Sequence, residues 1–236
     1  MLFLHGIGGS RHHWRDQLSF FAKDYKAAAW DARGYGDSDD YEGPLDFSAF
    51  AADVLRVLDF FRAPKAHIVG LSMGGRIARD VALRYPERVA TLTLANTHPG
   101  FDALSPQEVR RFVEERRNRT TESMRALLGS LARPGAYEAL LESFKALRKA
   151  SYLKTLEASV AQDRAAPVEN IRARTLVITG SEDRVYPASL ARAMAQRIPG
   201  AKLVEIAGCG HLSNLEQPER FNRIVRNFLL RQEELA

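Results

Sequence analysis

The sequence predicts an α/β protein with a mostly parallel, doubly wound sheet and a helical insertion. Short apolar runs alternate with amphipathic helical patterns over residues 1–100 and again over 168–236. Such alternation is typical of a parallel sheet covered by helices on both faces. Residues 101–167 contain helical patterns and no strand-like run. We therefore expect a core formed by 1–100 and 168–236, with 101–167 inserted into it.

The first part of the core is expected to alternate regularly between strands and helices. The predicted strands span 1–5, 26–30, 66–71 and 89–95, and the predicted helices span 11–23, 47–61 and 76–83. Trp14, Leu18 and Phe21 recur at helical spacing in the first of these helices. Pro64 ends the second helix, because the residue before a proline avoids helical geometry.

The insertion begins with a helix start signal, in which Ser105 and Glu108 form a capping box and Pro106 takes the first helical position. Further helices are predicted over 124–131, 137–147 and 152–160. Alternation then resumes, with strands over 175–179 and 202–207, a helix over 188–197 and a final helix from residue 218.

Composition limits the compartment and the partners. The chain has 236 residues, a net charge of +5 and one cysteine, Cys209. One cysteine allows no intrachain disulfide, which favours a reducing compartment, the cytoplasm. No apolar run approaches the length of a membrane span, and no signal-peptide pattern is visible. We therefore expect no membrane partner.

A local cluster of arginines raises the question of nucleic-acid binding. The arginines alternate with Glu108, Glu114 and Glu115 on a predicted helix; they are Arg110, Arg111, Arg116, Arg117 and Arg119. This mixture favours a solvated, ion-paired helix face, so no nucleic-acid partner is expected. No residues have metal-ligand spacing, and the first glycine-rich loop lacks nucleotide-binding spacing, so neither metal nor cofactor is expected.

Ser72 lies in a G-x-S-x-G sequence between a predicted buried strand and a predicted helix. The turn must be tight, because a β-carbon at Gly70 or Gly74 would collide with a neighbouring element. The serine hydroxyl would then project above the sheet. The N-terminus of the following helix would favour a negative charge that develops there.

Asp183 and His211 also follow the ends of predicted parallel strands. Ligands bind at this edge of an open α/β sheet. Each residue alone has a plainer explanation, since Asp183 could cap a helix and His211 could be an ordinary loop residue. The order serine, acid, histidine, each in a glycine-flanked turn, favours nucleophilic catalysis instead.

The chemistry requires these residue types. A serine hydroxyl is a weak nucleophile, so His211 would take its proton during attack, and Asp183 would orient the imidazole. An oxyanion needs two hydrogen-bond donors, for which we expect the backbone N–H groups of Met73 and Ile7. His98, Phe101 and Tyr186 are candidate walls of the substrate pocket.

Taken together, the motifs resemble those of α/β-hydrolases over nearly the whole chain. The matching motifs are His5-Gly6 with Gly8-Gly9, Asp31-x-Arg33-Gly34-x-Gly36-x-Ser38, Gly70-Leu71-Ser72-Met73-Gly74-Gly75, Gly180-x-x-Asp183 with Pro187, and Gly208-x-Gly210-His211. The chain is most similar to 3-oxoadipate enol-lactonases and related carboxylesterases, through its nucleophile motif and Leu94-Ala95-Asn96-Thr97. The resemblance implies that 101–167 forms a cap over the site. A serine nucleophile speaks against haloalkane dehalogenases and epoxide hydrolases.

The start of the chain departs from this resemblance. The family has two further strands, an antiparallel pair, before the strand that ends in His5-Gly6, and here the chain begins inside that strand. The strand over 26–30 would then lie at an exposed edge, which invites self-pairing. We expect a tendency to form homo-oligomers or aggregates through this edge, which a monodisperse monomer in light scattering would contradict.

The sequence thus predicts a cofactor-free serine hydrolase that cleaves a small carboxylic ester or lactone through an acyl-enzyme. Two alternatives remain open. One is a C–C bond hydrolase or perhydrolase that uses Ser72, His211 and Asp183. The other is a non-catalytic binding protein that keeps the fold.

Overall fold

The computed structural model of the chain describes residues 1–101, 104–162 and 167–233. Within them, six strands form one sheet in the order β2-β1-β3-β4-β5-β6, and every neighbouring pair is parallel. The strands are β1 (Leu2–Leu4), β2 (Ala28–Ala29), β3 (Ala66–Leu71), β4 (Val89–Ala95), β5 (Arg174–Gly180) and β6 (Lys202–Ile206). The predicted parallel α/β architecture is confirmed.

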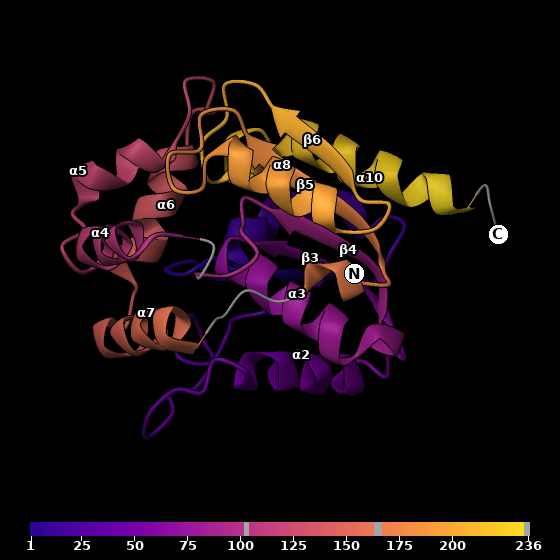
Figure 1. Cartoon of the computed structure of the whole chain (residues 1–236), viewed down its shortest axis with the longest axis horizontal. Helices are drawn as coiled ribbons and strands as arrows, with labels where there is room; N and C mark the ends of the chain where they lie inside the picture. Colours follow the sequence, from indigo (N-terminus) through magenta and orange to yellow (C-terminus); the bar gives the residue numbers. More distant parts are fainter. Residues whose placement is uncertain (102–103, 163–166, 234–236) are drawn as a thin grey trace.

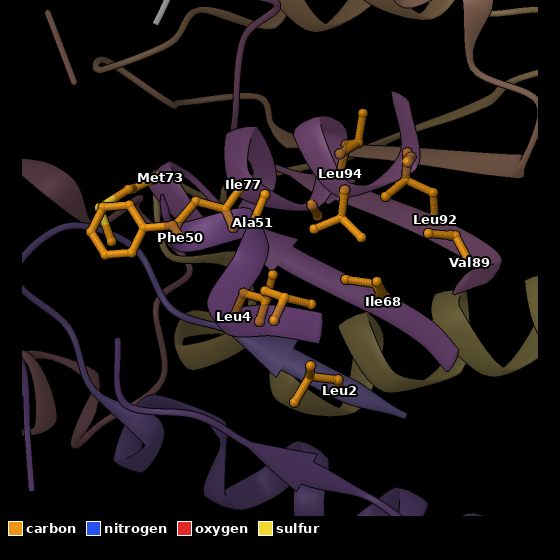
Figure 2. Packing of buried hydrophobic residues seen from close by; sticks show 14 of the residues in the cluster. Leu2, Leu4, Phe50, Ala51, Ile68, Met73, Ile77, Val89, Leu92 and Leu94 are labelled. Atoms are coloured by element: carbon orange, nitrogen blue, oxygen red, sulfur yellow. The ribbon is translucent and has the colours of Figure 1, made fainter. Parts of the chain in front are cut away.

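Helices cover both faces of the sheet (Figure 1). Leu2 and Leu4 of β1 pack on one face with α2 (Ala49–Phe60), α3 (Met73–Arg84) and α8 (Ala188–Arg197). Figure 2 shows part of this layer, in which Ile77 of α3 lies beside Phe50 and Ala51 of α2, and Leu92 of the sheet lies beside Val89. Phe3 points to the opposite face, where it packs with α1 (Arg15–Phe21) and α10 (Pro218–Glu233). Side chains alternate between faces along a strand, so each buried strand supplies both cores.

The predicted insertion consists of helices where it is described. These are α4 (Pro106–Arg117), α5 (Thr121–Met124), α6 (Ala136–Lys145) and α7 (Lys149–Gln162), which Figure 1 shows grouped on one side of the molecule. Residues 102–103 and 163–166 of the insertion lie outside the described residues. Short elements among the described residues are η1 (Arg11–Trp14), η2 (Pro86–Arg88), η4 (Arg125–Leu127), η5 (Val168–Asn170) and α9 (Ser213–Glu216). In the described part, no helix combines the length and apolar character needed to cross a membrane.

Several predicted boundaries change, and the helix over 124–131 is wrong. The Thr120 hydroxyl caps α5 by accepting the Ser123 N–H, so the helix begins earlier. It gives way to η4, because Gly129 passes so close to another loop that its β-carbon would lie 2.4 Å from the Gly208 carbonyl oxygen. The helix over 11–23 divides into η1 and α1, and the strand over 26–30 shortens to β2, which lies at an edge as expected.

Gly74 is the point where α3 touches the sheet most closely. A β-carbon at Gly74 would lie 2.1 Å from the Leu4 carbonyl oxygen, a backbone atom that cannot rotate away. We expect Gly74→Ala to lower the free energy of unfolding by about 3 kcal/mol, the upper end for overpacking. Gly43→Ala is the control, because Gly43 has φ of 73° but no described atom within 4 Å of its β-carbon position. It should cost about 1 kcal/mol in urea unfolding, and equal losses in the two variants would contradict a steric role for Gly74.

His13 of η1 should make the fold sensitive to acid. Burial lowers its pKa from 6.5 to about 3. Between these values the unfolded chain binds more protons than the folded one, so stability falls as pH drops below 6.5. At pH 5 the loss from this group is about 2 kcal/mol. His13→Gln should remove that part of the difference in unfolding free energy between pH 7.5 and pH 5, whereas His12→Gln, at an exposed position, should not.

Candidate active site

Ser72 lies on the turn between β3 and α3. Its backbone conformation, with φ of 55° and ψ of −116°, is rare for residues other than glycine. The turn is closed by glycines, since a β-carbon at Gly70 would lie 2.2 Å from the Gly74 carbonyl oxygen. Hydrogen bonds fix both backbone groups of Ser72. Its N–H donates to the Ala95 carbonyl (2.9 Å), and its carbonyl accepts from the Thr97 hydroxyl (2.8 Å).

The structure brings Ser72, His211 and Asp183 together. His211 Nε2 lies 3.0 Å from Ser72 Oγ, and His211 Nδ1 lies 3.1 and 3.0 Å from the two Asp183 carboxylate oxygens. A carboxylate only accepts hydrogen bonds, so Nδ1 carries the proton and Nε2 is left to accept from the serine. The three side chains are nearly excluded from solvent. The arrangement can therefore move a proton from the hydroxyl to the imidazole.

The Asp183 carboxylate is held by several donors. Oδ1 accepts the backbone N–H groups of Val185 (2.9 Å) and Tyr186 (3.0 Å), and Oδ2 accepts Asn96 Nδ2 (3.0 Å). Burial alone would raise the pKa of Asp183. His211 and these hydrogen bonds outweigh it and lower the pKa below its usual value. The residue is therefore a carboxylate, the form that can orient an imidazolium.

Asn96 and Glu216 support the site, although neither was assigned a role from the sequence. Asn96, at φ of 47°, donates to Asp183 and to the Gly210 carbonyl (3.0 Å), and accepts from Ser213 Oγ (2.5 Å). Its signal was the Leu94-Ala95-Asn96-Thr97 motif at the end of a buried strand. Thr97 of the same motif holds the Ser72 carbonyl, so the motif links the three loops that carry Ser72, Asp183 and His211.

Glu216 of α9 is fully buried and holds the loop that carries His211. Its carboxylate accepts the N–H groups of Gly210 (2.8 Å) and Leu212 (2.8 Å), the residues on either side of His211. It also accepts the N–H of Gly129 from the insertion (2.7 Å). One buried carboxylate therefore fixes the histidine loop and ties the insertion to it.

The loop after β1 carries Ile7, one of the two expected oxyanion donors. His5 holds the start of this loop: its Nε2 accepts the Ala32 N–H (3.0 Å), so Nδ1 carries the proton and donates to the Gly6 carbonyl (2.8 Å). Met73, the other expected donor, is the first residue of α3, and the first N–H groups of a helix have no partner within it. Ile7 lines a cavity that also contains Ser72 and His211.

This cavity is narrow and mostly apolar. The space open to the centre of a water-sized sphere is about 30 Å³, room for roughly two waters. The predicted pocket walls lie elsewhere: His98, Phe101 and Tyr186 form a buried aromatic group beside His211. None of the three is among the described residues that line the cavity.

Two arginines of the predicted surface cluster line the cavity instead. Arg111 of α4 pairs with Glu115 of the same helix (3.9 Å), as expected, and Arg117 pairs with Glu157 of α7 (2.8 Å). Arg116 and Arg119 turn inward, so the expectation of a solvated face is wrong for them. The sequence signal was the apolar stripe Val109, Phe112 and Val113, because Arg116 takes the next position of that stripe.

Removing one acceptor from Glu216 should weaken the fold. In Glu216→Gln, one carboxylate oxygen becomes an amide group that faces backbone N–H donors, which leaves at least one of them unpaired. We expect the free energy of unfolding to fall by about 1–3 kcal/mol. Glu219→Gln, an exposed position on α10, should change it by less than about 0.5 kcal/mol. Urea unfolding of both variants tests this, and similar stabilities would argue against the role of Glu216.

Comparison with known proteins places this geometry in a family. The α/β hydrolase fold family model matches residues 1–218. A 2-hydroxy-6-oxononadienedioate/2-hydroxy-6-oxononatrienedioate hydrolase of Burkholderia vietnamiensis is 31% identical over 98% of this chain and 87% of its own length. The 3-oxoadipate enol-lactonase 2 of Acinetobacter baylyi is 26% identical over 98% of this chain and 88% of its own.

One further relative is longer than this chain, and a solved structure has a similar fold. The chain spans 63% of the dihydrolipoyllysine-residue acetyltransferase component of the acetoin cleaving system of Cupriavidus necator, with 28% identity. The crystal structure of the enol-lactonase from Burkholderia xenovorans has a TM-score of 0.86, with 26% identity over 97% of this chain and 90% of that one. The chain belongs to the α/β hydrolase fold family.

Proposed function

We propose that the protein is a serine hydrolase that cleaves a small carboxylic ester or lactone through an acyl-enzyme. The observation that carries this proposal is the hydrogen-bonded chain from Ser72 Oγ through His211 to Asp183, at 3.0–3.1 Å between successive groups. The reaction class is also supported by the similarity to enol-lactonases.

The proposed mechanism has two half-reactions, and His211 acts first as base and then as acid in each. Ser72 Oγ attacks the carbonyl carbon and its proton passes to His211 Nε2. The N–H groups of Ile7 and Met73 stabilise the oxyanion, and His211 then protonates the leaving oxygen as the ester C–O bond breaks. Water then attacks the acyl-enzyme and gives a proton to His211 Nε2. The bond between the acyl carbon and Ser72 Oγ breaks, His211 returns the proton to Oγ, and the acid is released. Asp183 stabilises the imidazolium throughout.

A C–C bond hydrolase with the same three side chains is the second candidate. The Burkholderia vietnamiensis relative carries a name of that kind and is 31% identical to this chain. Formation of a peracid, or binding without turnover, requires no change in the arrangement of Ser72, His211 and Asp183, but the enol-lactonase and C–C hydrolase relatives favour neither. Tests on both esters and C–C substrates separate the first two candidates.

The proposal also assigns a cap, residues that contact the substrate, a cellular location and a mode of self-association. We propose that 101–167 acts as a cap inserted into a core of 1–100 and 168–236, since described residues of α4 to α7 line the cavity above Ser72. Met73 and Ile7 are retained as oxyanion donors. His98, Phe101 and Tyr186 are retained as substrate-binding residues only for a substrate that reaches beyond the present cavity. The cytoplasmic location rests on the single cysteine, and self-association on the exposed edge at β2.

Loss of the Ser72 hydroxyl should abolish turnover. We expect the wild type to hydrolyse short-chain p-nitrophenyl esters with a pre-steady-state burst, and Ser72→Ala to lose both the burst and at least about 10⁴-fold in kcat. Ser189→Ala, an exposed serine on α8, is the control and should keep full activity. Stopped-flow release of p-nitrophenol measures burst and turnover together.

The outcomes separate the candidates. Activity that survives Ser72→Ala would overturn the assignment of the nucleophile. A folded wild type that cleaves C–C substrates but no ester would favour the second candidate. A folded wild type that turns over neither class would favour a binding protein.

A further inference from the structure

Two guanidinium groups lie where a hydrolase of neutral esters needs none. Arg116 is in the last turn of α4 and Arg119 follows two residues after that helix ends. Both line the cavity that contains Ser72 and His211. The rest of the cavity wall from the insertion is apolar, with Met124, Leu127 and Leu140 among its residues.

Arg116 is buried without a negative partner among the described residues. The residue is 4% exposed, and its Nε is buried with no hydrogen-bond partner in the described part of the chain. Its guanidinium carbon lies 3.4 Å from the centre of the Phe112 ring, and Nη1 donates to the Phe112 carbonyl at 3.3 Å. Burying a charged group with unfilled donors is unfavourable unless something completes them.

The nearby acids do not supply the missing charge. Glu115 pairs with Arg111 and Glu157 pairs with Arg117, so these two carboxylates have arginine partners of their own. Across residues 1–101, 104–162 and 167–233, no carboxylate forms an ion pair with Arg116 or Arg119. Burial lowers the pKa of Arg116 to about 10 and also lowers the pKa of Arg119. Both side chains remain cationic at neutral pH.

We infer that Arg116 and Arg119 form a subsite for a carboxylate, so that the substrate is an ester or lactone with a second, anionic end. This inference rests on the proposed hydrolase function and names its substrate class. A carboxylate fits the planar fork of a guanidinium and can fill the open donors of Arg116. The apolar wall would contact the carbons between the carboxylate and the carbonyl group at Ser72.

The test compares two esters that differ only at the far end of the acyl chain. The monoester of glutaric acid with 4-nitrophenol carries a free carboxylate, and 4-nitrophenyl valerate has a methyl group in its place. We expect the wild type to favour the glutarate monoester by about tenfold or more in kcat/KM, mainly through KM. Rates without enzyme are subtracted, because the free carboxylate speeds spontaneous hydrolysis.

Variants locate the subsite. Arg116→Gln and Arg119→Gln should each lower the ratio of the two kcat/KM values by about tenfold, and Arg116→Lys should restore part of it because charge is kept. Arg117→Gln, on the same helix but paired with Glu157, should leave the ratio unchanged. If Arg116→Gln does not fold, Arg116→Lys and Arg119→Gln still decide the matter. A wild-type ratio near one, or a ratio unaffected by both arginine variants, would overturn the inference.

A binding measurement separates this inference from the proposed function. Glutarate should bind to Ser72→Ala in calorimetry and glutaramide, its neutral diamide, should not; adding Arg119→Gln should weaken glutarate binding by about tenfold. If no ester is hydrolysed but glutarate still binds in this way, the hydrolase function fails and the subsite stands. If esters are hydrolysed but glutarate binds no better than glutaramide, the function stands and the subsite fails.

Discussion

The contact between Gly74 of α3 and the Leu4 carbonyl of β1 is the constraint on which the site depends. With no side chain between them, the helix starts directly against the sheet, and the chain must turn at Ser72 within one residue. That turn places Ser72 at φ of 55°, with its hydroxyl oxygen 3.0 Å from His211 Nε2. The same close packing brings Gly6 under Ser72, where its β-carbon would lie 3.1 Å from the serine β-carbon. The close packing of α3 against β1 therefore fixes the positions of both Ser72 and the loop that carries the proposed oxyanion donor Ile7.

Buried carboxylates position the other two loops. Asp183 and Glu216 each accept at least two backbone N–H groups, which compensates for the loss of water around the charge. Glu216 also binds Gly129 of the insertion, and the His211 N–H donates to the Leu127 carbonyl at 2.7 Å. The insertion is thus hydrogen-bonded both to His211 and to the carboxylate that holds the histidine loop.

The sequence was sufficient to predict the strands and the loops that carry Ser72, Asp183 and His211. It was not sufficient to predict which partners the individual side chains contact. Periodicity and glycine spacing predicted every strand of the described sheet and the convergence of Ser72, Asp183 and His211, because parallel strand ends must share an edge. It failed at 124–131, where a contact with residues far along the chain overrides local helical preference. It also missed Glu216, since a glutamate in a polar loop carries no local sign of burial. His98, Phe101 and Tyr186, predicted as pocket walls, pack their rings on one another and are not among the described residues that line the cavity.

Helix α4 shows how the same residue type takes two roles on one element. Arg111 and Arg117 face solvent and pair with glutamates, an arrangement that contributes little to stability. Arg116 continues the inward stripe of Phe112, where an apolar residue would fill the space without the desolvation of a charge. Burial of this guanidinium is therefore unfavourable for the fold on its own. Burial of Arg116 becomes favourable when an anion accepts hydrogen bonds from its guanidinium. We therefore expect the carboxylate-bound protein to be more stable than the free protein at this position of α4.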